Sequence, residues 1–143
     1  MTLLAARQQA PTKAVNAFAG LVALIALLFL IQGLLAGLFL RYDGQRDASK
    51  KWIDAHANVA HAAFALSLVL AVLALARFRH RRDLTAGAIV LSVLIGIESY
   101  IGGAIVDNGK DAWTSIHVPL AMALMGTVTW LALKSAQLRR GNA

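Results

Sequence analysis

Residues 17–40 read AFAGLVALIALLFLIQGLLAGLFL, an apolar stretch in which Gln32 is the only polar side chain. A helix rises ~1.5 Å per residue, so a stretch of this length can cross the ~30 Å hydrocarbon core of a bilayer. Three further apolar stretches follow at about residues 55–76, 84–106 and 112–133. Because lipid offers no partner for backbone N–H and C=O groups, each stretch is predicted to be a transmembrane helix.

The composition of the chain supports this prediction. Of the 143 residues, 59% are hydrophobic and 15% are charged, whereas a soluble domain carries about 25% charged residues. This excludes a cytosolic globular enzyme, a disordered tail and a fibrous repeat. We therefore expect an all-α integral membrane four-helix bundle that forms one domain over residues 1–143, with helices at about 14–40, 55–77, 84–106 and 112–134.

The distribution of basic residues predicts the topology. The net charge is +7, and in a membrane protein such an excess sets orientation, so no nucleic-acid partner is expected. The two tails and the link between the second and third helices share one side. They hold nine basic residues: Arg7, Lys13, Arg77, Arg79, Arg81, Arg82, Lys134, Arg139 and Arg140. The other two loops hold five basic residues and five acids, Asp43 among them. We expect both termini in the cytoplasm of a multi-pass protein of the bacterial plasma membrane.

Two segments of the chain resemble each other at an offset of 66 residues. Residues 31–37, IQGLLAG, align with residues 97–103, IESYIGG. Both contain a small-x-x-x-small pattern, Gly33 with Gly37 and Ser99 with Gly103, which lets helix backbones approach closely. His61 and His117 occupy similar places on the second and fourth helices. The pattern predicts two helical hairpins related by a pseudo-two-fold axis along the membrane normal.

Four polar residues are predicted to lie at one depth in the outer half of the membrane: Gln32, His61, Glu98 and His117. Polar groups at such depth are costly and face the interior of a bundle. Two histidines on alternate helices can ligate a heme from opposite sides. Metal ligation is therefore assigned to His61 and His117. Gln32, Gly33, Gly37, Glu98 and Gly103 are expected to line the cofactor.

Several alternatives stay open at this point. His56 competes with His61 as the ligand, since five residues separate them and both cannot face the same axis. Both histidines of the pair can also be buried residues that hydrogen-bond neighbouring helices. Glu98 is the single carboxylate within an apolar stretch, and it serves either as a hydrogen-bonded side chain or as a proton relay. The chain has no cysteine, so a heme would be a non-covalent heme b.

The arrangement resembles one four-helix half of heme A synthase over roughly residues 14–134. The resemblance rests on His61 and His117, on segments 31–37 and 97–103, and on the fourth helix beginning Ile116-His117-Val118-Pro119. It implies heme-ligating histidines on the second and fourth helices. The family's functional glutamate before the histidine of the second helix has no counterpart in residues 54–60, and the cysteine pair of many members is absent. The resemblance thus implies heme binding without heme A synthesis by this chain alone.

The sequence favours a membrane-bound b-type cytochrome with one heme near the outer face, for electron transfer or heme handling. Its partners would be membrane lipid, a quinone or a redox protein, and it would form a homo-oligomer or join a larger respiratory complex. It is not expected to be a stand-alone enzyme. Two rival interpretations are a cofactor-free accessory subunit of a larger membrane complex and a proton-coupled transporter that uses Glu98.

Overall fold

The protein folds into four long helices. The computed structural model describes residues 12–42 and 45–141, so Arg7 and Asp43 lie outside the described residues. The helices are α1 (Thr12–Leu40), α2 (Arg46–Arg77), α3 (Arg82–Asn108) and α4 (Thr114–Gly141), and a 3₁₀ turn, η1 (Asp111–Trp113), precedes α4. All four are long and apolar enough to cross a membrane, and the described residues contain no strand. The predicted all-α membrane bundle is confirmed.

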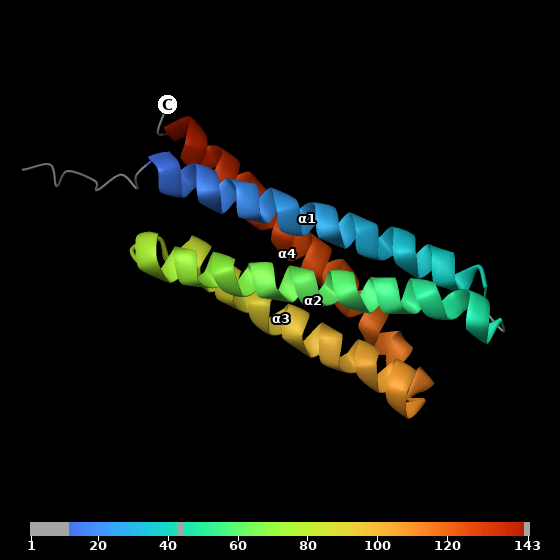
Figure 1. Ribbon diagram of the computed structural model, residues 1–143. Helices are drawn as coiled ribbons and strands as arrows, with labels where there is room; N and C mark the ends of the chain where they lie inside the picture. Colours follow the sequence, from blue (N-terminus) through green and yellow to red (C-terminus); the bar gives the residue numbers. More distant parts are fainter. Residues whose placement is uncertain (1–11, 43–44, 142–143) are drawn as a thin grey trace, which may run out of the picture.

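The helices form two hairpins, α1–α2 and α3–α4, and successive helices run in opposite directions along the bundle (Figure 1). α1 packs against α2 and α4, and α3 packs against the same two helices. α1 and α3 are therefore diagonal neighbours across the bundle, as are α2 and α4. Both ends of the described chain, together with the α2–α3 connection, lie at one end, which we call the basic end. The end with the α1–α2 and α3–α4 connections is the opposite end.

α2 begins at Arg46, about nine residues before the expected start. Hydropathy detects only the part of a helix that is apolar, whereas the polar turns before residue 55 continue the same helix. Within these turns Lys50 Nζ lies 2.6 Å from Asp54 Oδ2, an exposed ion pair four residues apart that suits helical geometry. This extension changes the depth of every residue on α2 relative to its helix start.

Side-chain packing is concentrated at the basic end. The buried core combines the first half of α1, the second half of α2, the first half of α3 and the second half of α4. Its largest fully buried members are Val15, Phe18, Val22, Ile25, Leu70, Phe78, Leu84, Leu91, Val128 and Leu131. Phe18 and Phe78 meet edge to face with ring centroids 5.3 Å apart, which is a favourable geometry for two aromatic rings.

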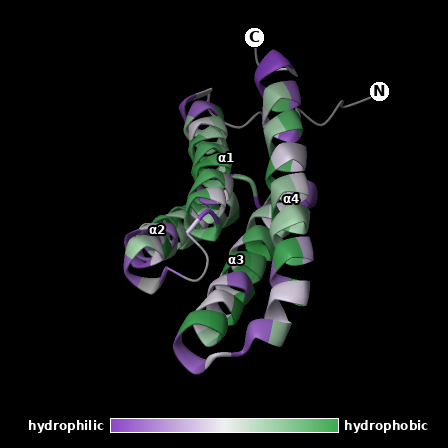
Figure 2. Ribbon diagram, turned by 90° about the vertical axis from the view of Figure 1, so that its right-hand side faces the viewer, coloured by the Kyte–Doolittle hydropathy of each residue, from purple (hydrophilic) through white to green (hydrophobic). Residues whose placement is uncertain are grey.

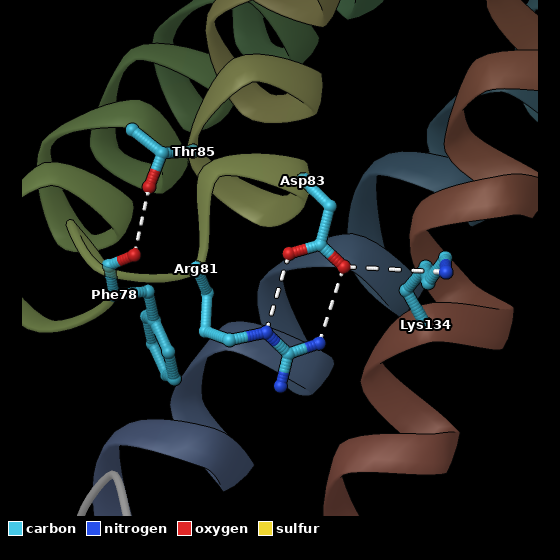
Figure 3. Close-up of polar contacts among 5 residues, drawn as sticks. All are labelled: Phe78, Arg81, Asp83, Thr85 and Lys134. Carbon is cyan, nitrogen blue, oxygen red and sulfur yellow. Dashed lines mark hydrogen bonds and ion pairs between the residues drawn. The ribbon is translucent and has the colours of Figure 1, made fainter. Parts of the chain in front are cut away.

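Hydrogen bonds add to this packing. Helices in lipid associate through close packing and polar contacts, because hydrophobic burial offers little gain there. Ser92 Oγ of α3 donates to the backbone oxygen of Ser67 on α2, over 2.8 Å. At the basic end itself, Arg81 donates to both carboxylate oxygens of Asp83 over 3.1 and 3.2 Å, and Lys134 Nζ of α4 lies 4.0 Å from the same carboxylate (Figure 3). The start of α3 is thereby linked to the end of α4.

The opposite half of the bundle is packed differently. Within residues 47–62 of α2 and 114–123 of α4, every described side chain is exposed or only half-buried. In Figure 1 the α1–α2 hairpin separates from the α3–α4 hairpin toward this end. Figure 2 shows the hydrophobic residues along the helices and the hydrophilic ones at the α3–α4 connection and at the end of α4. The chain's own side chains therefore close the basic half of the interior far better than the opposite half.

The close approach of α3 and α4 at the basic end supplies a stability test. A Cβ on Gly87 would lie 2.5 Å from Cζ3 of Trp130 and 3.0 Å from Cδ2 of the buried Leu131. Gly87→Ala should therefore overpack this contact and lower the free energy of unfolding by about 1–3 kcal/mol. The measurement is the thermal midpoint of the protein in detergent.

Gly126→Ala on α4 is the matched control, since a Cβ at Gly126 would meet nothing within 4 Å. Both substitutions carry the same intrinsic gain in helix propensity, so their difference isolates the packing. Equal midpoints for the two variants would contradict the described α3–α4 contact.

Candidate functional site

The inward face of each helix continues from the core into the opposite half. On α2 the buried positions Ala63, Ser67, Leu70 and Ala74 recur every three or four residues, and the same stripe extended backwards reaches His56. On α4 the buried positions Leu124, Val128 and Leu131 extend back to His117. Gln32 on α1 and Glu98 on α3 lie on the corresponding stripes, and all four side chains are half-buried or buried. We call Gln32, His56, Glu98 and His117 the polar layer.

Gln32 and His56 join α1 to α2 by two reciprocal contacts. The Gln32 side-chain amide donates from Nε2 to the backbone oxygen of His56 over 2.9 Å. The His56 ring returns a contact from Nδ1 to the backbone oxygen of Gln32 at 3.2 Å. Phe39 of α1 packs edge-on against the His56 ring, with centroids 5.5 Å apart. His56 is thus held in place by α1 on two sides.

The contact to Gln32 also defines the proton arrangement of His56. A backbone carbonyl only accepts hydrogen bonds, so Nδ1 must carry the hydrogen. In the neutral imidazole the remaining lone pair then belongs to Nε2. A histidine whose Nδ1–H binds a backbone carbonyl is a common arrangement among metal ligands, because it orients the ring and leaves Nε2 to bind.

On the other side of the bundle, His117 meets Glu98. His117 Nδ1 lies 3.1 Å from Glu98 Oε1, and the two side chains are 23% and 12% exposed. The ring rests against α3 at Gly102, where a Cβ would lie 3.2 Å from His117 Cε1. A Cβ at this position would be in tight contact with the ring, so Gly102 leaves room for the imidazole next to the carboxylate.

The opposite half contains buried polar atoms without a hydrogen-bond partner among the described residues. They are Gln32 Oε1, both oxygens of Glu98, Ser99 Oγ and His117 Nδ1, together with Trp52 Nε1. The 3.1 Å contact of His117 with Glu98 is close enough for an ion pair but is not aligned as a hydrogen bond. An unpaired buried polar group costs about 1–3 kcal/mol. Such atoms on all four helices indicate a place where further polar contacts could be made.

Other residues assigned from the sequence lie elsewhere. His61 is exposed on the outward face of α2, together with Ala62 and Leu68. Gly33 and Gly37 are exposed, and a Cβ at either would meet nothing within 4 Å. Gly103 is half-buried, with ordinary space toward Asp107. The structure therefore brings Glu98 to His117 and Gln32 to His56, whereas His61 and the two α1 glycines are exposed.

The early start of α2 at Arg46 changes the position of His56 along the helix. From Arg46, His56 lies ten residues into the helix, about 15 Å along its axis. The three-to-four-residue spacing of Ala63, Ser67 and Leu70 back to His56 is the signal that identifies the inward histidine. His56 and His117 thus lie on the inward stripes of two diagonal helices.

These features define a multi-pass membrane protein. Its four-helix bundle holds a polar layer with two histidines in the half away from the basic end. Comparison with known families assigns it further. The family model described as COX15-CtaA, cytochrome oxidase assembly protein, matches residues 41–143, which is 103 of the 143 residues. The chain belongs to this family, the heme A synthase family. The matched range contains His56, Glu98 and His117. No curated protein and no solved structure matches the chain.

The fit of His117 against α3 predicts a local response to substitution. Gly102→Ala should displace the imidazole from its place beside Glu98, because the new Cβ would lie too close to Cε1. The check is the resonance of the His117 Cε1–H group in protein labelled with ¹³C-histidine, in detergent micelles. Gly102→Ala should shift or broaden it, whereas Gly103→Ala should leave it in place. A His117 signal that responds equally to both substitutions would contradict the contact.

Proposed function

We propose that this chain is a membrane heme protein that holds one heme b in the opposite half of the bundle, between α2 and α4, for electron transfer or heme handling. The family is one of cytochrome oxidase assembly proteins, and heme is the cofactor that its chemistry concerns. The single observation that carries the proposal is the polar layer, in which His56 and His117 face the interior from diagonal helices.

The residues of the layer fit a heme in three respects. First, the free lone pair of the His56 ring is on Nε2, because Nδ1 donates to the backbone oxygen of Gln32. Second, the interior around it is not filled by buried side chains of α2 or α4. Third, the unpaired polar atoms of Gln32 and Glu98 could meet polar parts of a ligand or its bound water. A four-helix bundle holds cofactors in this way, between facing helices.

A bare metal ion fits less well. Within residues 12–42 and 45–141, no three His, Cys, Asp or Glu side chains are grouped as a site for a metal ion. A structural or catalytic ion such as zinc takes at least three protein ligands. The iron of a heme takes four ligands from the macrocycle, so only the axial ligands come from the protein. Two inward histidines meet that requirement.

Bound heme would supply a one-electron redox centre. The chain's own residues would determine how it is used. If His56 and His117 both held the heme, electron transfer would be favoured over oxygen binding. Gln32 and Phe39 hold the His56 ring in one orientation. A quinone or a redox protein is the partner class that suits such a centre in a membrane.

Near the opposite end of the bundle, lysines lie beside aromatic rings on α2 and around η1. Lys51 Nζ lies 5.0 Å from the centroid of the Trp52 ring, and Lys110 Nζ lies 4.6 Å from that of Trp113. We infer that this end faces the outer side of the plasma membrane, in agreement with the distribution of basic residues. Aromatic side chains then lie at the membrane–water interface, and lysines near them can pair with heme propionates.

The test of heme binding is the absorption spectrum of protein purified after expression with ample heme, oxidised and then reduced with dithionite. We expect a Soret band and the sharp α and β bands of a low-spin heme with two axial histidines. His117→Ala should lower heme affinity by more than tenfold. Removing a residue that only orients a metal ligand already costs roughly 10–100-fold in affinity. Absence of a Soret band in the unsubstituted protein would refute the proposal.

The choice between the two histidines of α2 is decided by a matched pair. His56→Ala should convert the spectrum to a high-spin form or abolish it, because one axial ligand is lost. His61→Ala, five residues further along the same helix, should leave the spectrum unchanged, since His61 faces outward. The reverse pattern would restore His61 as the ligand. Helix content measured by circular dichroism in detergent confirms that each variant is folded.

A further inference from the structure

We infer that Glu98 is the positioning residue for His117: its carboxylate accepts the Nδ1–H of the imidazole, fixes the tautomer and leaves Nε2 to bind iron. The inference rests on the proposed function, since His117 would be the axial ligand. It begins from the 3.1 Å between His117 Nδ1 and Glu98 Oε1. It assigns to Glu98 a function different from transport of protons.

The environment of Glu98 supports this assignment. The residue is 9% exposed in the bundle, and both carboxylate oxygens lack a hydrogen-bond partner among the described residues. Burial without partners is costly for a carboxyl group. Nδ1 of His117 is itself buried without a partner. A small rotation of either side chain aligns the two atoms already in contact and satisfies both at once.

The α1–α2 side of the bundle provides a precedent within the same chain. There the backbone oxygen of Gln32 receives Nδ1 of His56, and here a carboxylate oxygen of α3 faces Nδ1 of His117. Each inward histidine therefore meets an acceptor from the neighbouring helix through the same ring atom. In both rings the remaining nitrogen is Nε2, so the two histidines would offer the same ring atom to a bound iron.

The two acceptors differ in charge, and this difference has a chemical consequence. A carbonyl orients its histidine, whereas an ionised carboxylate also increases the electron density of the ring and makes it a stronger donor to iron. The charge of Glu98 would favour the ferric over the ferrous state of a bound heme. We therefore expect Glu98 to lower the reduction potential, while the carbonyl contact to His56 has no such effect.

The first arm of the test uses protein without heme. The ¹⁵N resonances of its histidines in detergent micelles show which ring nitrogen carries the hydrogen. We expect His117 in the Nδ1–H tautomer in the unsubstituted protein. Glu98→Leu should return it to the mixture of a free imidazole, and Glu98→Gln should retain it, because the amide oxygen still accepts. Ser99→Ala is the matched control, since it removes a buried polar atom beside Glu98 without touching His117.

The second arm uses protein loaded with heme. Glu98→Leu should lower heme affinity roughly 10–100-fold, the range typical of losing an outer-shell partner, and Glu98→Gln should restore most of it. Glu98→Gln should nevertheless have a more positive reduction potential than the unsubstituted protein, because the negative charge is gone. Ser99→Ala should alter neither quantity in this way.

The two arms separate the two proposals. A Glu98-dependent tautomer in protein that never binds heme would support the positioning contact and refute the heme function. If heme binds but Glu98→Leu changes neither the His117 tautomer nor the heme affinity, the positioning contact is refuted. The heme function would then still stand. A purely structural role of Glu98 would be shown by equal losses in Glu98→Gln and Glu98→Leu, which would also overturn the inference.

Discussion

A polar side chain that faces the interior of a membrane bundle has no water to pair with and must find its partner on another helix. In this chain the constraint applies to four residues at one level, and the contacts of Gln32 with His56 and of Glu98 with His117 are its result. Each contact joins helices that are neighbours in space. The register of α1 on α2, and of α3 on α4, therefore cannot slip by a residue without leaving buried polar atoms further from their partners.

The two halves of the bundle differ in how their interiors are packed. Aromatic and aliphatic side chains close the basic half, where Phe18 meets Phe78 and the Asp83 carboxylate links the start of α3 to the end of α4. Small residues such as Gly87 let the helices approach there. The opposite half lacks such filling on α2 and α4 and carries the polar layer instead. Stability and binding are thus supplied by different residues along the same four helices.

Much of this arrangement could be predicted from the sequence. Hydropathy alone identifies four membrane helices. A polar residue within an apolar stretch is expected to face inward, and Gln32, Glu98 and His117 are buried or half-buried. The choice between His56 and His61 could not be made from hydropathy, because α2 extends through polar turns that hydropathy does not detect. The pairing of Nδ1 atoms and the seat of His117 on Gly102 depend on how the helices are rotated, which only tertiary packing determines. The hairpin repeat inferred from segments 31–37 and 97–103 stays a prediction.

The packing of the basic half has a consequence for the order of assembly. Its core is completed by the chain's own side chains, and its polar groups, such as Ser92 and Asp83, find partners within the protein. Nothing in that half waits for a ligand. The helices of the basic half can therefore pack without a ligand, whereas the opposite half still has buried polar atoms without partners among the described residues. A ligand that binds after synthesis of the chain is finished would then complete a bundle whose helices are already arranged.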